Sequence, residues 1–270
     1  MKLNRIFLMA GVAMTMFMTA SCLDEDRFTA GYATNADSLN VYIVSDNNIT
    51  LPVDENTFEV VYARNHTNGE LTIPVVFGTG TPQIFTQVPS SVTFADGEEN
   101  ATITISCIPD MEMFKNYRAT IVVPEQYTTQ YADIETNLPR AELNVIKEDF
   151  ETVNKGTYYS QFNETEDPDV ELEWSEIKSC YRLSVSNAEF AHTFTFTVGE
   201  DCAISFNEPQ IYQGWDYPGY GGVYATAASD KPSLYDDEEK TYYFGFKYII
   251  PAAGGASFNG TYYDYFVVTE

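Results

Sequence analysis

The sequence predicts an all-β protein built from two β-sandwich-like domains, and three observations lead to this prediction. The chain contains 20 Tyr and 18 Phe in 270 residues, and aromatic side chains of this kind are enriched in strands. Apolar residues alternate with polar residues in short runs instead of recurring at helical spacing. Turn residues separate these runs at intervals typical of sandwiches and barrels.

Residues 1–21 are predicted to form a signal peptide that is removed during export. The segment begins with basic residues and continues with the apolar stretch Ile6–Ala20. That stretch is shorter than the roughly 20 apolar residues that a spanning helix needs. It leads into Thr19-Ala20-Ser21-Cys22, which resembles the lipobox of bacterial lipoprotein precursors. The resemblance implies cleavage before Cys22 and acylation of its thiol, and the alternative is an ordinary secretory peptide with an incidental cysteine.

Residues 22–40 are predicted to be a polar, acidic tether. Directly after Cys22 comes Leu23-Asp24-Glu25-Asp26, which resembles the export signal of surface lipoproteins in the Bacteroidetes. The resemblance implies a lipid-anchored protein on the outer face of the bacterial outer membrane. The alternative is that these acids only begin a solvated linker.

The large negative net charge limits the classes of ligand that we expect the protein to bind. The chain holds 40 acidic and 14 basic residues, and cleavage before Cys22 would remove two of the basic ones and change the net charge from −26 to −28. Such a protein repels nucleic acid and anionic lipid headgroups. We therefore expect no nucleic-acid partner, and we expect membrane attachment through the acyl chains at Cys22. Neutral glycans or cations suit this charge.

The first domain is predicted to span residues 41–149 as a β-sandwich. Short apolar runs separated by turn residues indicate about seven strands. The strands are expected at Val41–Val44, Thr57–Arg64, Glu70–Phe77, Ser91–Phe94, Ala101–Ile105, Tyr117–Val123 and Ala141–Ile146. The Asp96-Gly97 pair between the fourth and fifth of these strands predicts a β-hairpin.

Several short motifs in residues 50–124 occur in the order known from one family. They are Val53-Asp54-Glu55, Val92-Thr93-Phe94 with Gly97-Glu98, Thr102-Ile103-Thr104-Ile105 and Ile108-Pro109-Asp110-Met111-Glu112. Together they resemble the Calx-β domain, an immunoglobulin-like sandwich that can bind calcium. The resemblance implies that Glu55, Asp110 and Glu112 are calcium ligands, since calcium prefers several carboxylate oxygens. Residues 81–91 lack the family's Asp-Tyr pair, and the alternative is that the three carboxylates are solvated turn residues.

Residues 150–270 are predicted to form a second β-sandwich or a small barrel. Its eight strands are expected at Thr157–Phe162, Val170–Trp174, Tyr181–Ser186, Thr193–Val198, Ala203–Phe206, Gly222–Thr226, Thr241–Ile250 and Thr261–Val268. In the fourth and the seventh of these strands the aromatic residues fall on alternate positions and therefore share one face. The layout is similar to C-terminal domains of Bacteroidetes lipoproteins, a resemblance that implies no chemistry.

No recognisable catalytic motif occurs, and the protein is predicted not to be an enzyme. Its two histidines are His66, in a polar turn, and His192, on the apolar face of a strand. Neither stands in a nucleophile or metalloprotease motif. A carboxylate pair for glycoside cleavage stays open, because 40 acidic residues make some pair inevitable. No cofactor is predicted apart from the calcium that the Calx-β resemblance implies.

Two further interpretations concern the second domain. Cys180 and Cys202 could form a disulfide, or Cys202 could pack as a small apolar residue; the spacing of the cysteines matches no zinc motif. Trp174 alternates with Val170 and Leu172, so we assign its side chain to the core.

Residues 211–222 are predicted to be a loop that binds a ligand. Aromatic residues stand there among glycines and a proline, which favour an irregular surface segment. The candidate ligand-binding residues are Tyr212, Trp215, Asp216, Tyr217 and Tyr220. Their rings suit the C–H face of a sugar, and Asp216 and the nearby Gln213 could bond its hydroxyls. The alternative is that Trp215 and Tyr220 cap the aromatic core of their own domain.

We therefore expect a cell-surface, lipid-anchored binding protein that recognises a glycan. The alternative is a structural or adhesive surface protein that binds a protein partner, with the Calx-β-like domain as a spacer. Glycan retention that depends on residues 211–222 would favour the first hypothesis. Capture of a protein partner without any response to sugars would favour the second.

Overall fold

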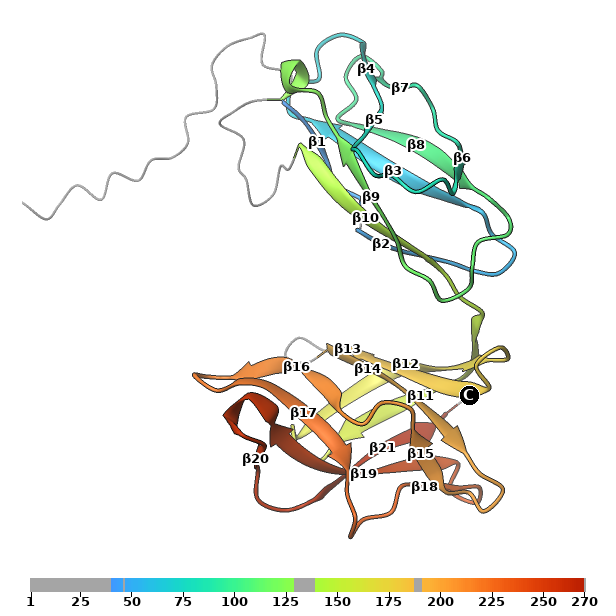
Figure 1. Ribbon diagram of the computed structural model, residues 1–270, viewed down its shortest axis with the longest axis vertical. Helices are drawn as coiled ribbons and strands as arrows, with labels where there is room; N and C mark the ends of the chain where they lie inside the picture. Colours follow the sequence, from blue (N-terminus) through green and yellow to red (C-terminus); the bar gives the residue numbers. More distant parts are fainter. Residues whose placement is uncertain (1–39, 46, 129–138, 187–190, 270) are drawn as a thin grey trace, which may run out of the picture. The chain divides into compact units, whose positions relative to one another are not determined.

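The described chain divides into two compact units. The computed structural model describes residues 40–45, 47–128, 139–186 and 191–269 (Figure 1). Unit 1 contains residues up to Ile146, and unit 2 contains Lys147–Glu270 together with the short segments Pro52–Glu55 and Glu112–Phe114. The predicted signal peptide, the lipidation site Cys22 and the tether as far as residue 39 lie outside the described residues.

The prediction of an all-β protein is confirmed. The described residues form 21 strands and two single-turn 3-10 helices, η1 (Glu125–Tyr127) and η2 (Pro251–Ala253). Aromatic and β-branched side chains on alternate positions favour this extended backbone, because they pack well on a pleated surface. In the part of the chain that the structure describes, no helix is long and apolar enough to cross a bilayer.

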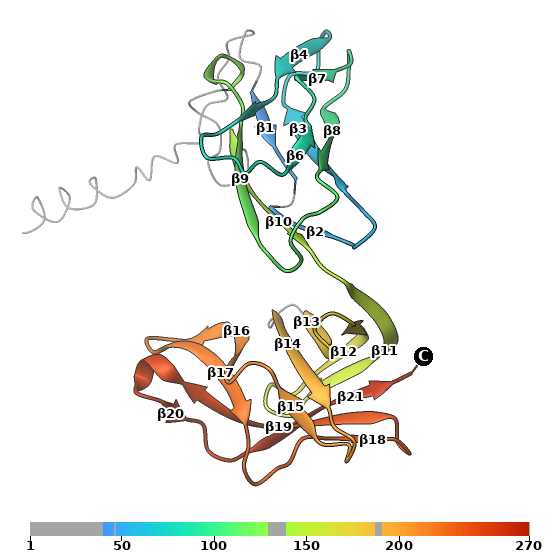
Figure 2. The ribbon, with the colours of Figure 1, turned by 45° about the vertical axis from the view of Figure 1, so that its right-hand side comes forward.

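Unit 1 is a sandwich of two four-stranded sheets. Its strands are β1 (Val41–Ile43), β2 (Asn48–Leu51), β3 (Thr57–Arg64), β4 (Leu71–Pro74), β5 (Val76–Phe77), β6 (Phe85–Gln87), β7 (Ser91–Phe94), β8 (Asn100–Cys107), β9 (Tyr117–Val122) and β10 (Arg140–Lys147). One sheet has the order β1-β3-β8-β6 and the other the order β2-β10-β9-β5, while β4 and β7 form a separate two-stranded sheet (Figures 1 and 2).

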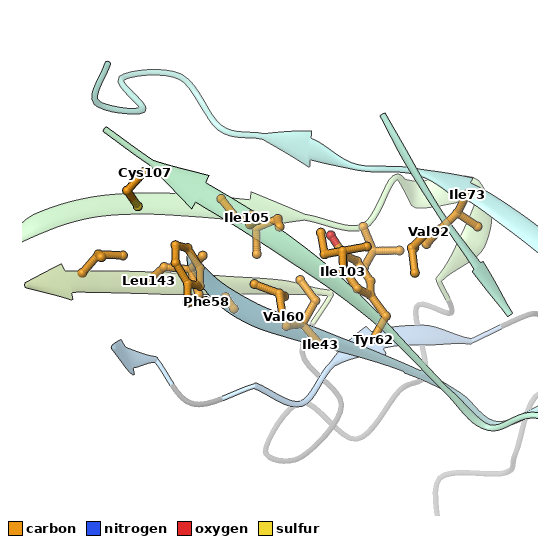
Figure 3. Close-up of a cluster of buried hydrophobic side chains, with 14 of the residues drawn as sticks. Ile43, Phe58, Val60, Tyr62, Ile73, Val92, Ile103, Ile105, Cys107 and Leu143 are labelled. Carbon is orange, nitrogen blue, oxygen red and sulfur yellow. The ribbon is translucent and has the colours of Figure 1, made fainter. Parts of the chain in front are cut away.

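The core of unit 1 lies between these sheets. Figure 3 shows Val60 and Tyr62 of β3 and Ile103 and Ile105 of β8 in this core, together with Leu143 of β10. All five side chains are buried. Val60 and Tyr62 stand on alternate positions of one strand, as Ile103 and Ile105 do on another, so each pair shares a face.

The β-hairpin predicted at Asp96-Gly97 is wrong. β7 pairs with β4, whereas β8 pairs with β3 and β6. The turn therefore carries the chain from the small β4-β7 sheet to a different sheet. Hydrogen bonds join this turn to residues of another turn. Gly97 donates its N–H to the carbonyl of Thr67 at 2.8 Å, and the Asp96 carboxylate accepts the N–H of Gly69 at 2.6 Å.

Arg64, the last residue of β3, is fully buried beneath this turn. Its Nε donates to the carbonyl oxygen of Glu98 at 2.8 Å and its Nη1 to that of Gly69 at 2.9 Å. Its Nη2 donates to the carbonyl oxygens of Thr67 and Ala95 at 3.0 and 2.7 Å. One guanidinium group thus satisfies four backbone acceptors in two turns, which fixes the path between the sheets.

The single strand predicted at Glu70–Phe77 is divided in the structure. β4 pairs with β7, and β5 pairs with β9 in another sheet. The division falls at Val75, whose N–H donates to the carbonyl of Ser90 at 3.1 Å. It follows Pro74, which has no N–H to continue the ladder.

Unit 2 is one curled antiparallel sheet of 11 strands. They are β11 (Phe150–Ser160), β12 (Thr165–Ser175), β13 (Cys180–Ser186), β14 (Ala191–Val198), β15 (Ile204–Phe206), β16 (Ile211–Tyr217), β17 (Gly221–Ala227), β18 (Leu234–Asp236), β19 (Thr241–Ile250), β20 (Ala256–Ser257) and β21 (Tyr262–Val268). The order is β15-β14-β13-β12-β11-β21-β19-β17-β16, and β18 and β20 also pair with β19. β11 and β12 begin seven and five residues before the predicted strands, at Phe150 and Thr165.

The sheet of unit 2 curls until its two ends meet. β16, at one end of the order, packs against β14, next to the other end (Figure 2). A Cβ atom on Gly214 would overlap the backbone of Ala191, so glycine permits the two strands to approach closely. Of the two architectures considered for this domain, the small barrel describes it better.

The interior of this barrel is aromatic, as the alternation predicted. Phe194 and Phe196 of β14 face Phe244 of β19, with ring centres 5.1 and 5.2 Å apart. The rings meet edge to face, the arrangement that aromatic pairs prefer.

One carboxylate lies inside the barrel. Asp264 of β21 is fully buried and accepts hydrogen bonds from the hydroxyls of Tyr158 and Tyr248 at 3.0 and 2.7 Å. Its other oxygen accepts the backbone N–H of Gln161 at 3.0 Å. Burial raises the pKa of Asp264, and these hydrogen bonds act in the opposite direction.

Candidate functional site

Residues 211–222 form a hairpin rather than the predicted loop. β16 runs through Tyr217, and β17 starts at Gly221 (Figure 1). The N–H of Tyr220 donates to the carbonyl of Tyr217 at 2.9 Å, and Gly219 has φ of +79°. Pro218 precedes this glycine, so the connection has the residues of a type II turn. We call residues Ile211–Ala227 the tyrosine hairpin.

The tyrosine hairpin carries all the exposed aromatic side chains of the described residues. Tyr212 is 43% exposed, Tyr217 40% and Tyr220 58%. The tight turn brings the rings of Tyr217 and Tyr220 to 5.7 Å from each other at its tip. Tyr220 therefore does not cap the core, and the structure brings two of the five predicted binding residues, Tyr217 and Tyr220, together as exposed rings.

Asp216 lies on the outer side of the same strand. Its carboxylate accepts a hydrogen bond from the Tyr212 hydroxyl at 3.1 Å. Partial desolvation and this hydrogen bond raise the pKa of Tyr212, so the hydroxyl keeps its proton at neutral pH. The pair offers a ligand both a phenol and a carboxylate oxygen.

Sequence reasoning missed Tyr224 and Gly222 on the opposite strand. Tyr224 is the cross-strand partner of Tyr212, and their ring centres are 5.3 Å apart. A Cβ atom on Gly222 would lie 2.9 Å from the Tyr224 ring and 3.0 Å from the Tyr212 ring. Glycine at this position lets both rings lie over the backbone. Alternation within the predicted strand Gly222–Thr226 was the available signal, but the partner strand was not recognised.

Trp215 of the predicted set and the nearby Gln213 point inward instead. The Trp215 ring is partly buried and packs against Phe162 and Phe258, each with ring centres 6.4 Å away. Gln213 is fully buried, and its Nε2 donates to the carbonyl of Ile211 at 3.1 Å. Trp215 thus packs against the core, as the alternative stated, and Gln213 is not available at the surface. A register shift between Tyr212 and Asp216 produces this inward turn.

The three candidate calcium ligands do not form a calcium site. Glu55, Asp110 and Glu112 are all exposed. Among the described residues, no group of three or more His, Cys, Asp or Glu side chains lies close enough to hold a metal ion. Calcium needs six to eight oxygen ligands, so the residues present do not fit it.

The structure also bears on the two predictions for the cysteines and for Trp174. Cys180 and Cys202 are not bridged. Trp174 shares the face of Leu172, but its side chain is only half-buried, and its Nε1 donates to the Glu176 carboxylate at 3.1 Å. The assignment of Trp174 to the core is therefore only partly right, because its ring is only half-buried.

His192 is buried in the barrel without a polar partner. Neither ring nitrogen has a hydrogen-bond partner among the described residues. The ring lies nearly parallel to that of Phe194, with centres 5.9 Å apart, and meets Tyr158 edge to face. Burial lowers the pKa of His192 from 6.5 to about 4.

We expect His192→Phe to raise the free energy of unfolding by ~1 kcal/mol at pH 7, because it removes two unsatisfied nitrogens and keeps the ring contacts. The unfolded imidazole binds a proton below about pH 6.5 and the folded one only below about pH 4, so the wild type loses up to about 3 kcal/mol as the pH falls through this window. The variant should lack this loss. Urea titrations at several pH values measure it, with the exposed His66→Phe as control; an unchanged acid dependence contradicts the prediction.

No protein-family model and no curated protein matches this chain. Solved structures similar to it include the apo form of the Calx CBD1 domain, with a TM-score of 0.32 and 15% identity over 42% of this chain and 99% of that domain. A protein of unknown function from Bacteroides ovatus has a TM-score of 0.34 and 10% identity over 86% of this chain and 95% of its own. The Calx CBD2 domain has a TM-score of 0.30 and 13% identity over 41% and 88%. Likenesses this weak carry no functional inference.

Proposed function

We propose that this protein is a lipid-anchored binding protein of the bacterial cell surface that holds a neutral glycan on its tyrosine hairpin. One observation carries the proposal: the three exposed aromatic rings of the described residues, Tyr212, Tyr217 and Tyr220, all lie on this hairpin. Exposed apolar surface is unfavourable in water, so exposed rings confined to one hairpin indicate a contact surface. The proposed activity is binding without a chemical step.

The chemistry of the hairpin suits a sugar. Tyrosine rings offer apolar faces for the C–H groups of a pyranose, and the hydroxyl of Tyr212 and the carboxylate of Asp216 offer hydrogen bonds to its hydroxyl groups. The net charge of −26 opposes an anionic ligand. The motif ending in Cys22, with the acidic residues after it, supports the anchoring part of the proposal.

The double substitution Tyr217→Ala/Tyr220→Ala is expected to weaken glycan binding at least about tenfold, because it removes both rings at the hairpin tip. Affinity electrophoresis of the full-length chain through gels containing neutral polysaccharides such as xylan, mannan or dextran measures this retention. Tyr220→Phe should bind almost normally, since it keeps the ring.

Ile177→Ala is the matched control, because Ile177 is an equally exposed apolar residue of unit 2, 61% exposed, outside the hairpin. Retention by a neutral polysaccharide that survives the double substitution would contradict the role of the hairpin. Absence of retention by any glycan, combined with capture of a protein partner, would favour the adhesive alternative.

A further inference from the structure

A second aromatic site lies at one end of the barrel of unit 2. It is a pocket of about 300 Å³, lined by Trp174, Ser179, Tyr181, Thr197, Val198, Tyr235 and Tyr242. Pockets at the mouths of β-barrels are common ligand sites, and this volume is at the lower end of their usual range. No residue of the pocket belongs to the tyrosine hairpin.

Register explains why four rings meet at this pocket. Trp174 of β12 is the cross-strand partner of Tyr181 of β13, and their ring centres are 4.8 Å apart. Tyr235 of β18 is the partner of Tyr242 of β19, at 4.4 Å. The two pairs adjoin where Tyr181 and Tyr242 approach to 6.1 Å. Two ring pairs from separate parts of the sequence thus form one aromatic wall.

Carboxylates outside the lining hold two of these rings. Trp174 donates from Nε1 to Glu176, and the Tyr235 hydroxyl donates to Asp237 at 3.4 Å. Desolvation raises the pKa of Tyr242 and of Tyr235, so both phenols stay protonated at neutral pH. The rings are therefore positioned by polar contacts and carry no charge.

The lining is uncharged in a strongly acidic protein. Acidic, basic and histidine side chains are absent from the seven described residues that line the pocket, although the chain as a whole carries 40 acids. A lining without a charged group favours a neutral ligand, because no lining residue compensates the desolvation of an ion. Aromatic rings combined with the hydroxyl residues Ser179 and Thr197 favour a ligand that is apolar on one face and hydroxylated at its edge.

We propose that this pocket holds one neutral sugar ring, the end of a glycan rather than its interior. The volume of about 300 Å³ admits a single ring against the aromatic wall and is too small for a run of linked rings. The inference does not depend on the tyrosine hairpin, because the two sites lie at opposite ends of the barrel. Trp174 aligns with Glu151 near the start of β11, whereas Trp215 packs on Phe162, just beyond its end.

The two tryptophans of the chain report separately on the two sites. In the Trp215→Phe variant, Trp174 is the only tryptophan and lies in the pocket. Titrating this full-length variant with neutral methyl glycosides of glucose, galactose, mannose and fucose should give a saturable change in emission with at least one of them. Glucuronate, the charged counterpart of glucose, should give none.

Tyr235→Ala in this background is expected to weaken the binding at least tenfold, because it removes one ring of the wall. Tyr263→Ala is the matched control, since Tyr263 is a half-buried tyrosine of the same unit outside the pocket. Tyr220→Ala should also leave the signal unchanged, which separates this site from the hairpin. A Trp174 emission that responds to no neutral glycoside, or a response that Tyr235→Ala leaves intact, overturns the proposal. So does saturation by an apolar probe such as phenol without any response to sugars.

Discussion

Replacing Arg64 with methionine is expected to lower the free energy of unfolding of unit 1 by about 3–5 kcal/mol, because four backbone carbonyls lose the hydrogen bonds of a buried, charged donor. The guanidinium is fully buried and donates to four backbone carbonyls, and it also lies 5.1 Å from the centre of the Phe94 ring. Methionine replaces the packing of the side chain but none of the five donors. The carbonyls of Gly69 and Glu98 would then lose the guanidinium as donor, while those of Thr67 and Ala95 would keep only their backbone partners, the N–H groups of Gly97 and Glu98.

Amide hydrogen exchange followed by mass spectrometry measures this effect segment by segment in the full-length chain. Protection should fall in the turn residues 65–69 and 95–99 and in the strands β3 and β8 that flank them. Arg64→Lys should be almost as harmful, since one ammonium group cannot reach four carbonyls. Arg118→Met, at an exposed position of β9, is the control. A loss below about 1 kcal/mol would show that the turns hold their path without Arg64.

Replacing Asp264 with alanine is expected to lower the free energy of unfolding of unit 2 by about 3–5 kcal/mol. The substitution leaves the hydroxyls of Tyr158 and Tyr248 and the N–H of Gln161 without their acceptor and opens a cavity. Asp264→Asn should cost less, because the amide oxygen still accepts. Urea denaturation monitored by tryptophan fluorescence reports on this unit, since Trp174 and Trp215 both lie in it.

A combined variant separates the hydrogen bonds from packing. Asp264→Leu/Tyr158→Phe/Tyr248→Phe removes the acceptor together with both hydroxyl donors, so it should recover much of the stability that Asp264→Ala loses. Asp237→Ala is the control, because that carboxylate is 75% exposed and its partners, Lys240 and the Tyr235 hydroxyl, lie at the surface of the unit. If the combined variant is no more stable than Asp264→Ala, the hydroxyl groups are not the cause of the loss.

The raised pKa of Asp264 makes the free energy of unfolding depend on pH in a predictable direction. Its pKa is raised in the folded protein, so the folded state holds this proton to higher pH than the unfolded state does. Its contribution to the free energy of unfolding therefore falls as the pH rises above the ordinary value of 3.8. This is opposite to the effect of His192, and Asp264→Asn should remove it.

The candidate site could be predicted only in part. The run from Tyr212 to Tyr220 marked the right segment, because clustered aromatics among turn residues are visible in the sequence. The structure assigns Trp215 to the interior and Tyr217 and Tyr220 to the surface, and this difference depends on a bulge and a tight turn. The pocket around Trp174 was not predicted at all, since Tyr235 and Tyr242 reach it from strands more than 50 residues later in the sequence.

The sequence by itself determined the all-β class and, within most strands, which side chains face the interior. Alternation along a strand is local: Phe194 and Phe196 share a face whatever strand lies beside them. The tertiary structure alone decided which strands pair. The Asp96-Gly97 turn looks like a hairpin locally, yet β7 pairs with β4 and β8 pairs with β3, and the buried Arg64 donates hydrogen bonds to carbonyls of the turn. Pairing, closure of the barrel and the burial of Asp264 depend on contacts between residues far apart in the chain, which local pattern does not encode.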